Sequence, residues 1–277
     1  MLLTKLMAIN LIFAPRNYKT LIMSKYIYIL LFLIGTTSSW AQTNKKLKFS
    51  EEELPVRNEF FVGGGISTRG FQVNLGYSLI KSPFRALSFF IDFGEVKDAK
   101  ERQQTYDGLS LRGGAPKSFI YGKKNNLFFS RIGYGEKYYL SARNRRLVSL
   151  GFTYSGGFTL GMVRPYYLDL IYRDNGGRPD IIPEKYDESN LLKFLNPEEV
   201  DGPSGAAYGW DELDLVPGVF LKAGLLIDWG AFDNVVKDIE IGIAADFYFE
   251  QIPIMIFEKN TPVFVNLYIT VHLGHRW

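Results

Sequence analysis

The sequence from Val263 to Trp277 reads VFVNLYITVHLGHRW and alternates apolar and polar side chains with a period of two. Successive side chains of a β-strand point to opposite faces, so the odd-numbered residues from Val263 to Leu273 would share one apolar face. The other face would carry polar residues that include Asn266 and His272. An apolar face about ten residues long, opposite a polar one, is typical of a strand in a membrane-spanning β-barrel.

Seven further segments show the same alternation, at 60–67, 71–79, 87–94, 126–136, 148–155, 219–230 and 239–250. Two of them are weaker, because 60–67 is rich in glycine and 126–136 carries aromatic residues on both faces. Eight is an even number of strands and the smallest usual size of a membrane barrel. The sequence therefore predicts an all-β fold, a small antiparallel transmembrane β-barrel of about eight strands with long extracellular loops.

The breaks between these segments alternate in length. Short breaks lie at 81–85, 137–146 and 230–237, and long ones at 97–125, 166–217 and 251–262. With a periplasmic N-terminus, the short breaks become periplasmic turns and the long ones extracellular loops, as in bacterial outer-membrane barrels. The tight turn at Thr68 and Arg69 is the exception on the long-loop side.

A soluble β-sandwich is the alternative, because its strands also have one apolar and one polar face. Aromatic residues near the ends of the predicted strands favour the barrel, where they would form interfacial girdles. They are Trp229, Phe247, Tyr248, Phe249 and Trp277. Trp277 also resembles the C-terminal signal that barrel-assembly machinery recognises. Outer-membrane lipid and that machinery, during insertion, are therefore the expected partners.

The N-terminal part predicts export. A cationic start at Met23, an apolar run over 26–34 and small residues at Ser39 and Ala41 match a signal peptide cleaved before Gln42. The apolar run is about half of the ~20 residues of a membrane-spanning helix, which makes a membrane anchor the weaker alternative. We expect an upstream extension over 1–22, a signal peptide over 23–41, a periplasmic segment over 42–58 and the barrel over 59–277.

Composition limits the possible functions. The 277-residue chain has a net charge of +3, which is too small to favour nucleic acid as a partner. It contains no cysteine, which removes disulfides, thiolate metal sites and cysteine nucleophiles. We expect no cofactor and no metal.

Several stretches resemble a known group of proteins. They are 116–129, 131–135, 154–161, 164–168, 209–213 and 249–255. Together they resemble uncharacterised outer-membrane β-barrel proteins of Bacteroidetes, broadly the PorT-like group, over about 60–277. The resemblance implies a barrel fold and a location in the cell outer membrane, and it supplies no catalytic residues.

The predicted inward faces carry a set of polar and charged side chains. These are Asp92, Arg131, Lys222, Asp228, Glu240, Asp246, Glu250, Asn266 and His272. The lumen of an eight-stranded barrel is filled by side chains, so the set predicts a polar network of ion pairs and hydrogen bonds. The alternative is a small polar path or a ligand pocket.

The only two histidines, His272 and His275, lie three residues apart in the last strand, so they point to opposite faces and cannot bind one metal ion. A lipid-modifying barrel enzyme could use His272 with Asp246 on the neighbouring strand, but no serine is placed beside them. We expect a protein that is not an enzyme.

The two longest loops differ in charge. The segment 97–125 is predominantly basic, and the segment 173–216 is acidic. One interpretation is that the two loops dock on each other. The other is a binding surface, either for an envelope protein or for divalent ions that bridge anionic glycolipid, although no EF-hand spacing is present. We expect 173–216 to be exposed and dispensable for folding of the barrel.

These observations lead to one functional hypothesis with two alternatives. The hypothesis is a non-catalytic outer-membrane barrel that docks a partner within an envelope assembly or secretion system. A solute or ion path through the lumen and a lipid-modifying enzyme are the alternatives.

Overall fold

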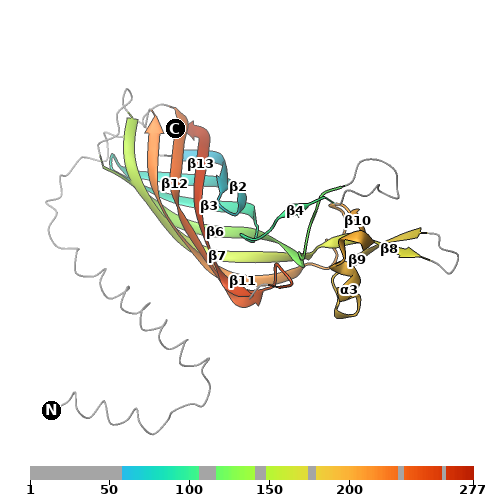
Figure 1. Cartoon of the computed structure of the whole chain (residues 1–277). Coiled ribbons are helices and arrows are strands. Elements are labelled where there is room, and N and C mark those ends of the chain that lie inside the picture. Colours follow the sequence, from blue (N-terminus) through green and yellow to red (C-terminus); the bar gives the residue numbers. More distant parts are fainter. Residues whose placement is uncertain (1–57, 106–116, 141–147, 174–178, 230–233, 258–259) are drawn as a thin grey trace, which may run out of the picture. The chain divides into compact units, whose positions relative to one another are not determined.

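The computed structural model describes residues 58–105, 117–140, 148–173, 179–229, 234–257 and 260–277, all within one compact unit, Glu51–Trp277. Eight antiparallel strands form a closed barrel in the order β1-β13-β12-β11-β7-β6-β3-β2 (Figure 1). The predicted fold class is confirmed. The predicted signal peptide, the upstream extension and nearly all of the 42–58 segment lie outside the described residues.

All eight predicted strands are present, and most are longer than predicted. Their bounds are β1 (Asn58–Ser67), β2 (Gly70–Ser82), β3 (Arg85–Val96), β6 (Asn125–Tyr139), β7 (Val148–Pro165), β11 (Asp214–Trp229), β12 (Val235–Ile252) and β13 (Thr261–Arg276). The two weaker segments, which became β1 and β6, take their places in the barrel because each has a strand partner on both sides.

The barrel closes with a stagger. The stagger is found by following paired residues around the barrel from Phe61 on β1. The path goes through β2, β3, β6, β7, β11 and β12 and reaches Phe264 on β13. The strand β1 itself pairs Phe61 with Gly274, so the ladder closes ten residues further along β13 (274 minus 264). Strand number and stagger together set the tilt of barrel strands and the width of the lumen. The tilted strands are visible in Figure 1.

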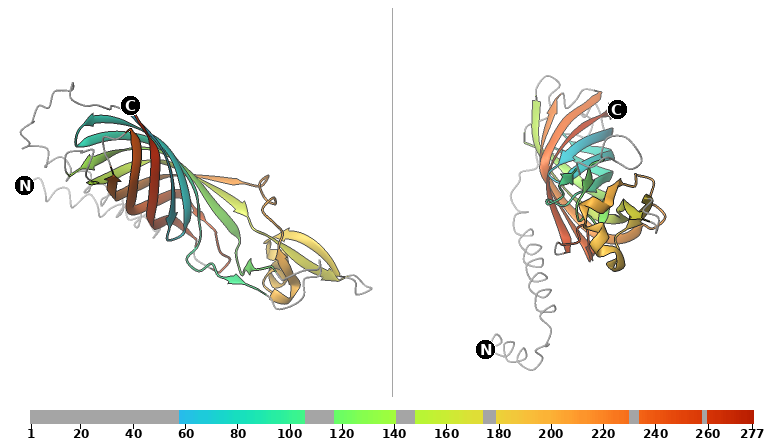
Figure 2. Two further views of the ribbon diagram at one scale, coloured as in Figure 1. Left: turned by 90° about the horizontal axis from the view of Figure 1, so that it is seen from above. Right: turned by 45° about the vertical axis from the view of Figure 1, so that its right-hand side comes forward.

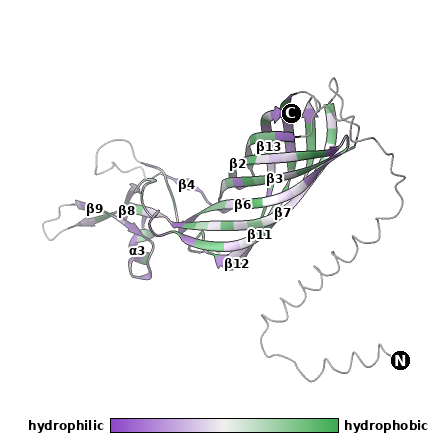
Figure 3. Ribbon diagram, turned by 180° about the vertical axis from the view of Figure 1, so that it is seen from behind, coloured by the Kyte–Doolittle hydropathy of each residue, from purple (hydrophilic) through white to green (hydrophobic). Residues whose placement is uncertain are grey.

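The exterior of the barrel is apolar and its interior is polar over much of its length. Leu267 and Ile269 on β13 are 57% and 45% exposed, whereas the adjacent Asn266 is 3% exposed. Figure 3 shows apolar and polar residues succeeding one another along the barrel strands. A water-soluble sandwich would bury its apolar faces, whereas this closed sheet leaves them exposed all round. The structure therefore supports the membrane barrel over the sandwich.

Two residues differ from the predicted pattern. Tyr248, predicted in an interfacial girdle, is buried and points into the barrel. Glu250, predicted to face inward, is exposed. Tyr248 keeps the alternation of β12, which places it on the same inward face as Asp246. Glu250 lies beyond Phe247, where the β12–β13 pairing shifts register and alternation no longer follows the wall of the barrel.

The long segment between β7 and β11 is folded, although the sequence predicted a loop. It contains a three-stranded sheet in the order β10-β8-β9, formed by β8 (Tyr167–Arg173), β9 (Pro179–Lys185) and β10 (Val200–Pro203). The helical turns between β9 and β10 are η4 (Glu188–Asn190), α3 (Leu191–Phe194) and η5 (Pro197–Glu199). Figure 2 shows this small sheet and its helices in two views.

The segment between β3 and β6 contributes two short strands, β4 (Gln103–Gln104) and β5 (Phe119–Ile120), which pair with each other. Among the described residues, no helix has the length and apolar character needed to cross a membrane.

Candidate functional site: the lumen and its extracellular cover

The polar part of the lumen is a network of ion pairs that reach across the barrel. Arg131 on β6 donates from Nε and from one terminal nitrogen to the two carboxylate oxygens of Asp246 on β12, at 2.7 and 2.6 Å. Its other terminal nitrogen lies 3.7 Å from Asp92 on β3. Lys222 on β11 donates to the same Asp92 at 3.0 Å. A bidentate contact of this kind holds a guanidinium in one orientation, so these four strands are tied together at one level.

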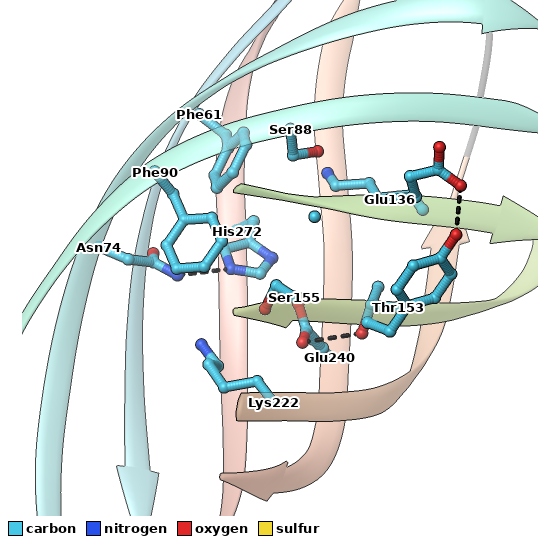
Figure 4. A pocket seen from close by; sticks show the side chains of 13 residues that line it. Phe61, Asn74, Ser88, Phe90, Glu136, Thr153, Ser155, Lys222, Glu240 and His272 are labelled. Carbon is cyan, nitrogen blue, oxygen red and sulfur yellow. Dashed lines mark hydrogen bonds between the residues drawn. The ribbon is translucent and has the colours of Figure 1, made fainter. Parts of the chain in front are cut away.

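Glu240 lies beside a small cavity next to this cluster. Its carboxylate accepts hydrogen bonds from the hydroxyls of Thr153, at 2.9 Å, and Tyr268. The cavity has a volume of about 30 Å³ and is lined in part by Glu240, Lys222 and His272 (Figure 4). At roughly 10–15 Å³ for each water, it holds about two water molecules. It is far too small for a solute.

A second cluster lies nearer the end of the barrel where the short turns are. Glu59 on β1 accepts from Lys137 at 2.6 Å and from Arg276 at 2.7 Å. Arg276 also donates to Asp228 at 2.7 Å, and Lys137 lies 3.5 Å from Asp238. All five side chains are buried. Buried charges are costly unless each one has a partner, which is the arrangement found here.

His272 belongs to this second cluster. Its Nδ1 contacts Asp238 and its Nε2 lies 2.9 Å from the side-chain nitrogen of Asn74. An amide nitrogen only donates, so Nε2 accepts and Nδ1 carries the proton that faces Asp238. The predicted neighbour Asp246 is instead bound to Arg131. Because Nε2 faces an amide and not a hydroxyl, this His272 geometry is that of a structural residue.

The structure brings most of the predicted polar residues together in the lumen, but sequence reasoning missed three further members of the network. Eight of the nine predicted residues point inward and Glu250 does not. The missed ones are Glu59, Lys137 and Asp238, whereas Arg276 lies on the polar face predicted for the last strand. Each missed residue lies within three residues of an end of its strand, outside or at the edge of the predicted segment. Extending the alternation by two residues from Phe61, Gly135 or Glu240 would have placed each of them inside.

The extracellular end of the lumen is apolar. The side chains of Leu127, Phe129, Tyr248 and Phe264 are buried there and pack with Ile252, Ile254 and Met255 from β12 and the segment that follows it. Arg131 stacks its guanidinium on the Phe129 ring, with 3.8 Å between the carbon and the ring centroid, where the polar zone meets the apolar one. This apolar plug and the packed ion pairs oppose the alternative of a solute path through the lumen.

A cover of loop segments lies over the plug. The Ile254 carbonyl accepts from the backbone nitrogens of Lys124 and Asn125 at 2.8 and 3.1 Å, and Ile256 donates to Gly122. Lys123 and Glu101 form a buried ion pair at 2.8 Å. These contacts join the segment before β6 to the segment before β13, so the cover connects two loops that are far apart in the sequence.

The two oppositely charged loops do contact each other, and an apolar core joins them. Phe119 from the basic loop is 2% exposed and packs against four side chains of the other segment: Leu168, Leu170, Phe194 and Val200. The Tyr166 hydroxyl also accepts from the backbone nitrogen of Ile120 at 3.3 Å. Burial of apolar surface thus holds the loops together. The prediction of loop docking is confirmed, whereas the charge difference that suggested it is not what packs them.

Trp277 lies at the seam where the barrel closes. Its backbone exchanges hydrogen bonds with Asn58, at 2.9 and 3.1 Å, and its half-exposed ring lies near Tyr77 and His275. This placement fits an interfacial aromatic residue. Its role as an assembly signal stays a prediction.

No family model matches the chain, and no curated protein matches it. Three solved structures that it is similar to are barrels of other bacteria. They are the N-terminal β-barrel domain of Pseudomonas aeruginosa OprF (9% identity, TM-score 0.33, 79% of this chain and 96% of that chain), Ail, the attachment invasion locus protein of Yersinia pestis (11%, 0.35, 80% and 99%), and a major outer membrane protein from Thermus thermophilus (13%, 0.34, 79% and 99%). Because these sequence identities and TM-scores are low, the assignment of the barrel fold is based on the strand pairing of this chain itself. The resemblance to Bacteroidetes proteins stays a prediction.

Proposed function

We propose that this integral outer-membrane β-barrel is a non-catalytic docking protein, which presents a folded extracellular platform to another envelope protein. We define the platform as β8, β9, β10, α3 and the two short turns η4 and η5, together with Phe119. The observation that carries the proposal is the platform's own apolar core, in which Leu168, Leu170 and Phe194 are at most 1% exposed. A segment that only connected two strands would need no such core.

The side chains that fill the lumen support the same proposal. It is filled by paired charges and closed by the apolar plug, so the barrel has no room for a transported solute. The single inward histidine is committed to Asp238 and Asn74. What remains accessible is the extracellular surface, and long folded loops on a rigid barrel are the usual place for binding.

Exposed apolar residues mark where a partner would bind on the platform. Leu192 on α3 is 88% exposed and Ile182 on β9 is 39% exposed. Edge strand β9 carries Pro179 and Pro183, which lack the N–H needed to pair with a further strand. We therefore infer that the partner uses side-chain contacts and does not extend the sheet.

The test is removal of the platform from the intact barrel. A deletion of 180–208 alone would leave β8 without both of its neighbours, so we replace Tyr167 to Leu213 with a short Gly-Ser linker. Asp214 pairs with Val163 in the β7–β11 ladder, so a short linker closes the two strands into a hairpin. We expect heat-modifiable migration to be retained and the copurifying envelope protein to be lost.

Two results would contradict the proposal. If the same proteins copurify with the shortened barrel, the interaction lies elsewhere. If the shortened chain inserts but a small solute now leaks from loaded liposomes, the segment serves to close a pore. A second variant, Leu192→Ser, changes only the exposed surface of the platform. It should weaken copurification without affecting insertion.

A further inference from the structure

An ion pair lies on the outer wall of the barrel, where side chains face lipid. One terminal nitrogen of Arg85, the first residue of β3, lies 2.8 and 2.7 Å from the two carboxylate oxygens of Glu136 on β6. The hydroxyl of Tyr154 on β7 donates to the same carboxylate. The Arg85 and Glu136 side chains are 54% and 25% exposed. Charge on the lipid face of a barrel costs stability. A charged pair in this position is therefore expected to bind a ligand or to lie at the boundary of the hydrocarbon layer.

Glu136 of this pair lines one end of a groove with a volume of about 750 Å³, which crosses four strands. It lies between two rows of outward side chains that the strand register places side by side. One row is Glu136, Tyr154, Ala223 and Ile243, and the other is Tyr134, Gly156, Leu221 and Ala245. Small residues at Gly156, Ala223 and Ala245 leave the space, and the larger ones form its walls.

The dimensions of the groove suit a single hydrocarbon chain. Three interstrand spacings of ~4.8 Å separate β6 from β12, which gives a length of about 14 Å. Glu136 lies near the turn-side end of β6, whereas Ile243 lies in the middle of β12. The groove therefore leads from one boundary of the apolar belt toward its middle, as an acyl chain does.

The charged end of the groove can still bind other groups. The contact with Glu136 uses one of the three nitrogens of Arg85, so Nε and the other terminal nitrogen can donate to a phosphate. Glu136 can accept from an ammonium group, and the rings of Tyr134 and Tyr154 beside it favour a cation. An anionic head group would instead bring a second negative charge to Glu136.

We propose that this groove binds a zwitterionic phospholipid of the phosphoethanolamine class. Its phosphate contacts Arg85, its ammonium contacts Glu136, and one acyl chain lies along Gly156 and Ala223. The site faces the leaflet next to the short turns, because Arg85 directly follows the β2–β3 turn. The groove lies on β6, β7, β11 and β12 and shares no element with the platform, so its test is independent of the docking function.

The experiment measures lipid retention by the full barrel. The purified protein in detergent is mixed with phosphatidylethanolamine, phosphatidylglycerol of the same acyl chains, or inorganic phosphate, and native mass spectrometry counts bound molecules. Ala223→Leu fills the groove, and Arg85→Gln with Glu136→Gln removes both charges. Gly64→Leu on β1 is the matched control, because it adds the same outward side chain where the space is open, on a strand outside the groove.

We expect one retained phosphatidylethanolamine for each barrel, at least tenfold more than phosphatidylglycerol. Ala223→Leu should lower retention at least tenfold, Gly64→Leu should leave it unchanged, and the double charge variant should remove the preference between the two lipids. Circular dichroism and heat-modifiable migration verify that each variant folds. Equal retention of both lipids by the unmodified barrel would overturn the proposal. So would equal effects of Ala223→Leu and Gly64→Leu, or binding of inorganic phosphate without any lipid.

Discussion

Glu59, at the start of the first barrel strand, and Arg276, at the end of the last one, form a buried ion pair with Oε2 and Nε 2.7 Å apart. The two strands are neighbours at the seam where the barrel closes. The pair therefore links the two ends of the barrel chain by charge, in addition to the backbone ladder. Glu59 also binds Lys137 on β6, so one carboxylate connects the seam to the opposite wall.

Removing this carboxylate should destabilise the barrel strongly. Glu59→Gln leaves Lys137 and Arg276 buried with one anion fewer, and the loss of one partner from a buried pair costs about 3–5 kcal/mol. Urea unfolding in detergent micelles measures the change. Glu59→Gln combined with Lys137→Met should recover part of the loss, because the excess cation is then also removed.

The control for that series is Lys237→Gln, since Lys237 on β12 is exposed. It should change the free energy of unfolding by less than about 0.5 kcal/mol. An equal loss in Lys237→Gln and Glu59→Gln would show that the buried cluster contributes nothing specific.

The lipid-facing register can be tested at Leu267, which is 57% exposed. Leu267→Arg should cost about 2–4 kcal/mol, because it places a cation in the hydrocarbon layer. A nitroxide at 267 should be quenched by a lipid-soluble reagent, and a nitroxide at 266 should be protected from it. The opposite pattern of quenching would invert the assigned faces of β13.

The platform should unfold without the barrel when its core is emptied. Phe194 is 1% exposed, and Phe194→Ala should cost about 3–5 kcal/mol of platform stability. Limited proteolysis of the inserted protein measures this as faster cleavage between β7 and β11, while heat-modifiable migration stays unchanged. Leu192→Ala, two residues away on the exposed side of α3, should not alter cleavage. A variant at 194 that fails to insert would mean that platform and barrel fold as one unit.

The titration of Glu212 gives a prediction on pH. The Nζ of Lys185 lies 2.8 Å from Glu212, and this hydrogen bond lowers the pKa of the Glu212 carboxyl below its usual value. A depressed pKa in the folded state means that the contact stabilises the platform above the usual glutamate value near 4.5. That contribution is lost as the pH falls through the lowered pKa. Both side chains are largely exposed, so the effect on stability is small.

Carbon-detected NMR of the labelled side chain measures the pKa of Glu212 directly. Lys185→Met should raise it toward the ordinary glutamate value, whereas Lys193→Met, on α3, should leave it in place. An unchanged pKa in Lys185→Met would show that the pair does not persist in solution.

Alternation was sufficient to place all eight barrel strands, including the glycine-rich strand β1. The reason is physical, since a shift of one residue would turn every apolar side chain into the lumen. At Gly63 a side chain would overlap Asn74 and His272, so glycine there follows from the packing of the lumen and does not argue against a strand.

The sequence was less informative where charge lies at strand ends. Lys137 was assigned to a turn, and Asp238 was left one residue before a strand, because charged residues near a break are also typical of loops. Only the neighbouring strands show that both point inward. The platform was missed for a similar reason: Leu168 and Leu170 alternate, but β8 has seven residues and its neighbour β9 contains two prolines. Short strands beside prolines resemble loops until their partners are known.

The ion pairs of the lumen have a consequence for how the protein enters a membrane. Most of them join strands that are not adjacent, such as Arg131 with Asp246 and Lys222 with Asp92. A single hairpin entering lipid would carry these charges without their partners, at a cost of several kcal/mol for each ion. We therefore expect insertion to proceed in one cooperative kinetic step, in which the strands assemble around hydrated charges and water leaves only as the seam closes. A hairpin-by-hairpin route would leave one member of each such pair unpaired in hydrocarbon.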